Sequence, residues 1–120
     1  MSEVMIVDDE PTIQQLMAII LEDMGHMVIS QPTNGDSAIR AYRSMAKKPD
    51  LLIIDHRIPI LSGSDLASMV IEENPEQRIL FLTADGSVRD EITALGIKDF
   101  LEKPADIETI KKAVETALSR

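Results

Sequence analysis

Five short apolar runs alternate with longer amphipathic stretches along the chain, and this alternation constrains the fold more than any other feature of the sequence. The runs cover residues 4–7, 27–29, 51–54, 79–82 and 100–101. Each run is bounded by polar residues, as is typical of a strand that is buried on both faces. Short connections between such strands and the intervening helices predict a parallel sheet with right-handed crossovers and helices on both faces.

The intervening stretches carry apolar residues at helical spacing, and polar residues or glycines mark where each helix begins or ends. Five helices are expected: residues 13–24 before Gly25, a second after Gly35 and Asp36, a third capped by Ser64 and closed by Asn74 and Pro75, a fourth over 87–95 before Gly96, and a fifth after Asp106. The predicted fold is therefore α/β, a (βα)5 doubly wound three-layer sandwich. Its five-stranded parallel sheet is expected to have the flavodoxin-like order 2-1-3-4-5.

The length and charge of the chain narrow the class of protein. With 120 residues the chain is long enough for one core and too short for two ordinary domains, so one domain over residues 1–120 is expected. A net charge of -9 argues against contact with a nucleic-acid backbone, and the absence of cysteine excludes disulfides and thiolate zinc sites. The N-terminal residues look like neither a signal peptide nor a membrane span, so a cytoplasmic location is the default expectation.

Three acidic residues follow the first and third apolar runs. Asp8 and Asp9 come after residues 4–7, and Asp55 comes after residues 51–54. Doubly wound sheets bind ligands beyond the carboxyl ends of their strands, where the strand order reverses, and the first and third strands are neighbours there. A lone Asp at a strand end would be interpreted as a helix cap. Three carboxylates in one pocket would repel one another and favour Mg²⁺, which prefers oxygen ligands.

Two further polar residues follow the last two strands. Thr83 comes after residues 79–82, and Lys103 comes after residues 100–101. Taken alone, the threonine would be a turn residue and the lysine a solvated charge. Together with the acids they suit phosphoryl transfer, in which catalysis consists mainly of positioning and charge neutralisation. Asp55 is the candidate nucleophile, because an aspartate can become an acyl phosphate.

These residues together resemble the receiver domain of two-component response regulators, and the resemblance covers essentially the whole chain. It rests on five positions in register across the strands, namely Asp8, Asp9, Asp55 in IIDHRIPILSG, Thr83 in LTA, and Lys103 before Pro104. The resemblance implies that a sensor histidine kinase or a phosphotransfer protein passes a phosphoryl group from phosphohistidine to Asp55, with slow self-dephosphorylation afterwards. The chain would then be a phosphoacceptor and not an enzyme that acts on other substrates.

The resemblance also implies how Mg²⁺ would be held. Asp9 and Asp55 would bind the metal directly, and Asp8 would orient the metal-bound waters. The backbone carbonyl of Arg57 would supply a further ligand, so the side chain at this position would matter less for the metal than for the mouth of the pocket.

For the phosphoryl group, the resemblance implies contacts with Lys103, the Thr83 hydroxyl and the Ala84 amide. Movement of Thr83 toward the phosphoryl group would let Phe100 turn inward. The packing of the fourth helix, fifth strand and fifth helix would then change, and this face would bind a downstream output protein, a fused output domain or a second copy of the chain. The peptide bond between Lys103 and Pro104 is expected to be cis.

Three positions around the pocket need separate interpretation. His56 stands where an apolar residue is usual in the family, and strand alternation points it away from Asp55. We interpret it as a hydrogen-bonded or surface histidine and not as a second phosphoacceptor. Arg57 and Asp85 flank the mouth of the pocket, where they either form an ion pair that slows loss of the phosphoryl group or remain two solvated charges.

Other functions remain open. A receiver-like module could bind partners without being phosphorylated. An aspartyl-phosphate phosphatase usually carries a second Asp two residues after its nucleophile, but Arg57 occupies that position. A flavin carrier of the same strand order would stack aromatic rings on the flavin, but the only aromatic residues are Tyr42, Phe81 and Phe100. Neither direct nucleic-acid contact nor membrane binding is expected of this domain.

Overall fold

The computed structural model describes residues 1–120 and confirms the predicted alternation of five strands with five helices. The elements are β1 (Glu3–Val7), α1 (Pro11–Asp23), β2 (Met27–Ser30), α2 (Gly35–Ser44), β3 (Leu51–Asp55), α3 (Gly63–Glu73), β4 (Ile79–Thr83), the short 3₁₀ helix η1 (Gly86–Val88), α4 (Arg89–Ala94), β5 (Asp99–Glu102) and α5 (Ile107–Leu118). None of these helices combines the length and the apolar character that crossing a membrane requires.

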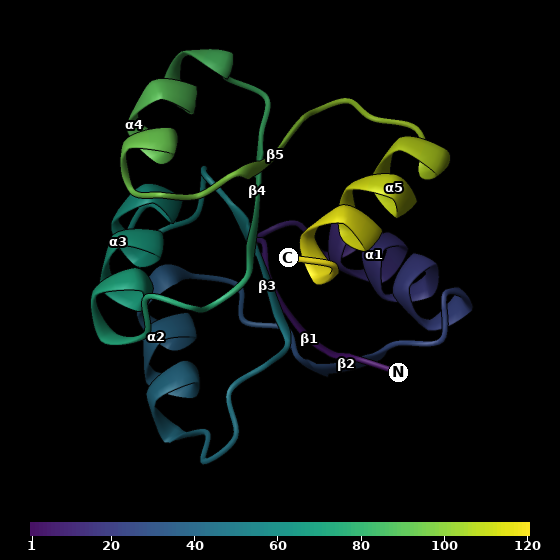
Figure 1. Ribbon diagram of the computed structural model, residues 1–120, viewed down its shortest axis with the longest axis horizontal. Coiled ribbons are helices and arrows are strands. Elements are labelled where there is room, and N and C mark those ends of the chain that lie inside the picture. Colours follow the sequence, from purple (N-terminus) through teal and green to yellow (C-terminus); the bar gives the residue numbers. More distant parts are fainter.

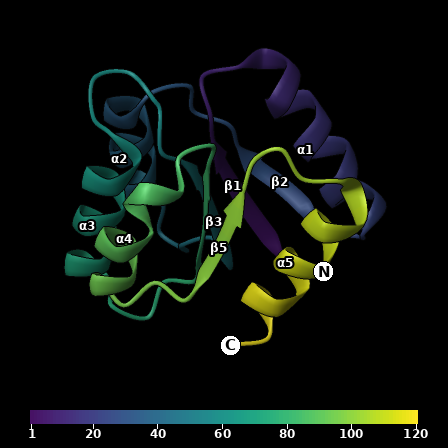
Figure 2. The ribbon, with the colours of Figure 1, turned by 90° about the horizontal axis from the view of Figure 1, so that it is seen from above.

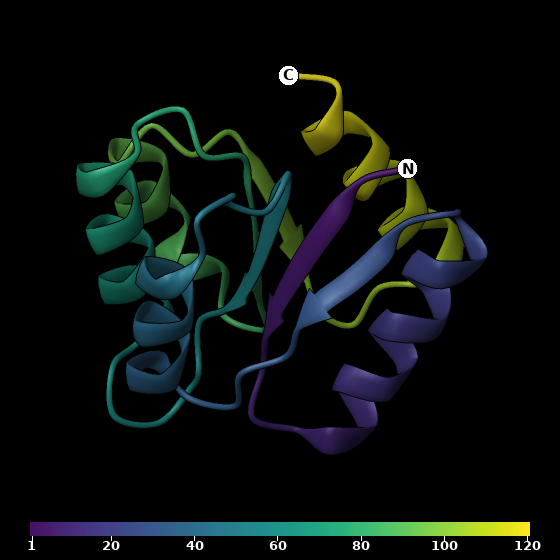
Figure 3. The same ribbon diagram turned by 90° about the horizontal axis from the view of Figure 1, so that it is seen from below.

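The strands form one parallel sheet in the predicted order, β2-β1-β3-β4-β5. Helices α1 and α5 cover one face of the sheet, and α2, α3 and α4 cover the other (Figure 1). The same three layers are visible from above in Figure 2. In Figure 3 the arrows of β1, β2 and β3 point the same way, so the carboxyl ends of the strands lie along one edge of the sheet.

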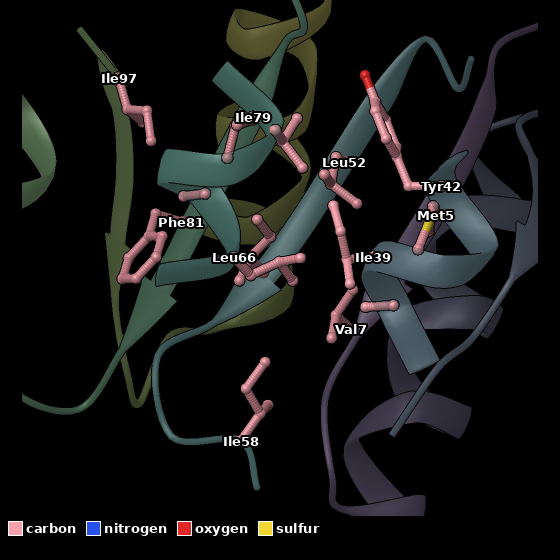
Figure 4. Packing of buried hydrophobic residues seen from close by; sticks show 14 of the residues in the cluster. Met5, Val7, Ile39, Tyr42, Leu52, Ile58, Leu66, Ile79, Phe81 and Ile97 are labelled. Carbon is pink, nitrogen blue, oxygen red and sulfur yellow. The ribbon is translucent and has the colours of Figure 1, made fainter. Parts of the chain in front are cut away.

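The central strands β1, β3 and β4 are buried along nearly their whole length, which is why each appears in the sequence as a continuous apolar run. Successive side chains alternate between the two faces. Leu52 and Ile54 of β3 belong to the cluster packed under α2, α3 and α4, part of which is shown in Figure 4, whereas Leu51 and Ile53 belong to a second cluster under α1 and α5. Burial of each such side chain contributes roughly 1.5–3 kcal/mol to the stability of the fold, so packing on both faces stabilises the sheet.

The start of α3 differs from the prediction by two residues. The N-cap is Ser62, whose hydroxyl accepts a hydrogen bond from the Asp65 amide at 3.2 Å. Ser64 is buried in the first turn, where its hydroxyl lies 3.1 Å from that of Ser62. The next residue of the helix after the cap is Gly63, and a Cβ there would collide with the backbone carbonyl of Asp55. This close approach of Gly63 to β3 sets where the helix begins. The contact cannot be inferred from the sequence, in which Ser62 and Ser64 are both possible caps.

The fourth helix is also shorter than predicted. Residues 86–88 form η1, which is capped by the Asp85 carboxylate accepting a hydrogen bond from the Ser87 amide at 2.9 Å. The α-helical part spans only Arg89–Ala94, where the sequence pattern predicted one helix over residues 87–95. Aspartate favours such local side-chain bonds to the backbone, and here the bond produces a tight 3₁₀ turn before the α-helix.

Candidate functional site at the carboxyl edge of the sheet

The register of β1 and β3 explains how the acidic residues meet. Val7 pairs with Ile54, so Asp8 and Asp55, the next residue along each strand, lie side by side at the edge of the sheet. Carboxylate oxygens of Asp8, Asp9 and Asp55 all lie within 4.8 Å of one another. Asp8 and Asp55 are buried and Asp9 is exposed, so the cluster opens to solvent on one side. Carboxylate oxygens at this spacing are the kind of ligand set that suits Mg²⁺.

The register of β4 and β5 brings a cation to the acids. Thr83 pairs with Glu102, and Lys103 is the next residue along β5. The Nζ atom of Lys103 lies 3.2 Å from Oδ2 of Asp8 and 3.3 Å from Oδ1 of Asp55. The Lys103 side chain is 24% exposed, so these contacts are only partly screened by water. Lys103 therefore compensates part of the negative charge of the cluster.

The pKa values of Asp55 and Lys103 shift for different reasons. Burial raises the pKa of Asp55 above its ordinary value, and the neighbouring carboxylates raise it further, although the Lys103 ammonium opposes them. Burial lowers the pKa of Lys103, but the Asp55 and Asp8 carboxylates outweigh the burial, and the net pKa is raised. Lys103 is therefore a fixed positive charge at neutral pH, whereas ionisation of Asp55 is less favourable than that of a free aspartate.

Hydrogen bonds hold both the carboxylate and the backbone of Asp8. Its carboxylate accepts a hydrogen bond from the Glu10 amide at 2.9 Å, and its own amide donates to the Pro32 carbonyl at 3.3 Å. The Gln14 side chain donates to the Asp8 carbonyl at 3.1 Å. Gln14 is not among the residues identified from the sequence. The signal that could have found it is a polar residue on the apolar face of α1, three positions before Met17.

Thr83 and Ala84 also lie at this edge. Thr83 is buried, and its hydroxyl accepts a hydrogen bond from the Asp85 amide at 3.0 Å and donates to the Asp85 carbonyl at 3.4 Å. Alternation along β4 places Thr83 on the same face as Phe81, whereas Asp55 belongs to the opposite face of β3. The Thr83 hydroxyl is therefore bonded to the backbone beside it and not to Asp55, and the exposed Ala84 follows at the open side of the pocket.

Phe100, the predicted switch residue in β5, is half-buried. Its ring stacks on that of Phe81, with the ring centroids 6.1 Å apart and an interplanar angle of 20°. The guanidinium of Arg89, the first residue of α4, lies 4.9 Å from the Phe100 centroid, a cation–π contact that connects α4 to β5. The peptide bond between Lys103 and Pro104 is cis, as the resemblance implied.

The structure decides two questions about residues around the pocket. His56 packs beside Phe81, which agrees with the alternation of β3. The residue is half-buried and its Nδ1 atom is buried without a hydrogen-bond partner, so the expectation of a hydrogen-bonded histidine is wrong for this atom. No ion pair joins Arg57 and Asp85, because the Asp85 carboxylate bonds the Ser87 amide instead. That hydrogen bond is the main cause of the lowered pKa of Asp85, and the charge of Arg57 makes a smaller contribution.

Ile60, in the loop between β3 and α3, has a strained backbone. Its φ is 73°, a left-handed conformation that is rare for β-branched residues, and its side chain is 81% exposed. We expect Ile60→Gly to increase the free energy of unfolding by roughly 0.5–1 kcal/mol, because relief of the strain outweighs the greater freedom of glycine in the unfolded chain. Urea unfolding measures this. The half-exposed Ile107 at the start of α5 is the matched control, because Ile107→Gly relieves no strain and should lower stability; a loss of stability in both variants would contradict the prediction.

Comparison with known proteins agrees with the fold. The family model for the response regulator receiver domain matches residues 4–115. The chain is 34% identical over 119 residues to TcrX of Mycobacterium tuberculosis, described as a probable transcriptional regulatory protein, and 37% identical over 117 residues to the response regulator protein PilR of Pseudomonas aeruginosa. These matches cover 98% and 95% of this chain.

The solved structures include a close match in shape. The crystal structure of a response regulator receiver domain protein from Clostridium thermocellum superimposes with a TM-score of 0.88 and 26% identity, covering 100% of this chain and 96% of that one. The chain spans 50% of the length of TcrX and 25% of that of PilR. Because the family model matches nearly the whole length of this chain, the chain belongs to the family of response regulator receiver domains of two-component systems.

Proposed function

We propose that the chain is a phosphoacceptor, in which Asp55 takes a phosphoryl group from the phosphohistidine of a sensor histidine kinase or a phosphotransfer protein. The observation that carries this proposal is Lys103, whose ammonium lies 3.3 Å from Asp55 inside a cluster of carboxylates. In the transfer, a carboxylate oxygen of Asp55 attacks the phosphorus and the bond between phosphorus and the histidine nitrogen breaks. The electron pair of that bond stays on the imidazole, and Asp55 becomes an acyl phosphate.

Asp8, Asp9 and Asp55 are the residues that would hold Mg²⁺, with the backbone carbonyl of Arg57 as a further ligand. An all-oxygen set at this spacing supports the choice of this ion. When bound, Mg²⁺ would neutralise charge on the phosphoryl oxygens. Lys103, whose pKa is raised by its carboxylate neighbours, would exchange one of these partners for a phosphoryl oxygen and keep its charge throughout.

The proposed switch begins at Thr83. Both hydrogen bonds of its hydroxyl are to the backbone of Asp85, so one local rearrangement would free the hydroxyl for the phosphoryl group, with the Ala84 amide as a second donor. The space that Thr83 leaves would admit the ring of Phe100, and this movement would break the contact of Phe100 with Arg89. The face formed by α4, β5 and α5 would then change its packing.

The position of the site supports the proposed partners. An apolar groove of about 220 Å³ lies beside Lys103 and is lined mainly by residues of α1 and the segment before α5, among them Ile13, Leu16, Pro104 and Ala105. Its position next to the acids supports docking of the phosphodonor protein there. The α4-β5-α5 face would bind a downstream output protein, a fused output domain or a second copy of the chain. Residues 1–120 would act together as one receiver domain.

Intact-protein mass spectrometry after incubation with acetyl phosphate and Mg²⁺ tests the proposal. The expected result is a single phosphoryl adduct that decays slowly and does not form when the metal is chelated. A chain that gains no adduct from acetyl phosphate or from its kinase would be a binding module that works without phosphorylation. Continuous release of inorganic phosphate from substrates in excess, with little adduct, would indicate a phosphatase.

A further inference from the structure

Gln14 joins three segments of backbone behind the acidic cluster. Its side chain is buried, and its Nε2 atom lies 3.1 Å from each of three carbonyl oxygens, those of Ile6, Asp8 and Pro32. The amide has two hydrogens for these three acceptors, so the carbonyls share them. The carbonyls belong to β1, to the loop that follows β1 and to the loop that follows β2. One side chain therefore fixes the geometry where these segments meet.

The orientation of the Gln14 amide is set by a second glutamine. Gln31 donates from its Nε2 atom to Oε1 of Gln14 at 2.8 Å and to the Gln14 backbone carbonyl at 3.0 Å. Because the oxygen end of the Gln14 amide accepts from Gln31, the nitrogen end must face the three carbonyls. Gln31 is exposed, so a residue at the surface orients the buried side-chain amide of Gln14.

We infer that Gln14 is a positioning residue for the Mg²⁺ site, an inference that rests on the proposed function. It holds the Asp8 carbonyl while the Asp8 amide donates to Pro32 at 3.3 Å, so the backbone that carries Asp8 and Asp9 is held on both sides. Without this donor, the Asp8 carbonyl would lose its hydrogen bond, although the Pro32 carbonyl would keep the Asp8 amide, and the loop after β1 would move toward water to satisfy the Asp8 carbonyl. The Asp8 and Asp9 carboxylates would move with it. Groups that orient metal ligands typically change metal affinity by 10–100-fold when they are removed.

Calorimetric titration of the metal-free chain with Mg²⁺ tests this role without any phosphorylation step. We expect Gln14→Met, which keeps the length of the side chain and removes the amide, to weaken Mg²⁺ binding about tenfold. Gln15→Met is the matched control, because Gln15 is the exposed neighbour on α1 and should leave the affinity unchanged. Urea unfolding of the same chains without metal separates a change of affinity from a change of stability.

The outcomes separate the inference from the proposed function. A Gln14→Met chain that is less stable but binds Mg²⁺ within twofold of the wild type would have lost only a structural residue, and the positioning role would be overturned. If Gln14→Met does not fold, Gln31→Ala decides: about threefold weaker binding supports the role, and unchanged binding overturns it. A wild-type chain that binds no Mg²⁺ overturns the metal site together with this inference. If the wild-type chain is phosphorylated and Gln14→Met binds Mg²⁺ as tightly as the wild type, the inference alone is overturned and the proposed function stands.

Discussion

An Asp55→Asn chain is expected to take up no phosphoryl group from acetyl phosphate under conditions that label the wild type. The asparagine amide is a much weaker nucleophile than a carboxylate. Asp8 is not expected to replace it, because its two carboxylate oxygens are bonded to the Glu10 amide and to Lys103. Intact mass in the presence of Mg²⁺ should show the adduct on the wild type and on Asp65→Asn, which alters an exposed Asp of α3. An equal adduct on Asp55→Asn would contradict the assignment.

The same substitution is expected to stabilise the metal-free fold at neutral pH. The pKa of Asp55 is raised in the folded chain above its ordinary value of 3.8, chiefly by burial, so the folded state binds this proton more tightly than the unfolded state. Stability therefore falls as the pH rises from about 3.8 through the folded pKa, and Asp55→Asn escapes this loss. We expect a melting temperature about 3 °C higher than that of the wild type at pH 7. The difference should shrink on acidification, and a gap that is independent of pH would contradict this explanation.

The sheet order and the core of the site could be predicted because both depend on short-range patterns. An apolar run between polar residues identifies a strand that is buried on both faces, and parallel pairing then brings the residues after each run to one edge. Asp8, Asp55 and Lys103 meet for this reason. Their proximity needs the strand order, a register in which Val7 pairs with Ile54, and the pairing of β4 with β5 that places Lys103 just beyond the end of the sheet. Helix spacing was equally informative for α1 and α5, whose apolar faces are continuous.

The structure differs from the sequence-based prediction where a polar side chain could form hydrogen bonds or ion pairs with several partners. Asp85 could pair with Arg57 across the pocket, but a bond to the amide two residues ahead requires almost no ordering of side chains. Ser62 and Ser64 are both suitable caps, and the contact of Gly63 with the backbone of β3 decides between them. Gln14 finds its acceptors in segments that are remote in sequence. No periodic pattern reports such contacts, because they depend on how loops are placed around the finished sheet.

A Lys103→Met chain is expected to be strongly destabilised at neutral pH in the absence of metal. The ammonium lies between Oδ2 of Asp8 and Oδ1 of Asp55, whose side chains are only 1% and 8% exposed. Methionine fills a similar volume but leaves the buried carboxylates facing each other without a cation. Removing one partner of a buried ion pair costs about 3 kcal/mol or more, and we expect a loss of this order in the free energy of unfolding. Urea unfolding at pH 7 with the metal chelated measures it.

The dependence of this loss on Asp55 and on pH distinguishes charge from packing. Without Lys103, the pKa of Asp55 should rise further, so protonation begins at a higher pH and the deficit of Lys103→Met should shrink as the pH falls. Combining Lys103→Met with Asp55→Asn should cost less than Lys103→Met alone, because fewer carboxylates are left uncompensated. Lys112→Met, at an exposed position of α5, should change stability by less than about 0.5 kcal/mol. A deficit that persists unchanged in acid and in the double variant would mean that Lys103 acts through the packing of its aliphatic stem and not through its charge.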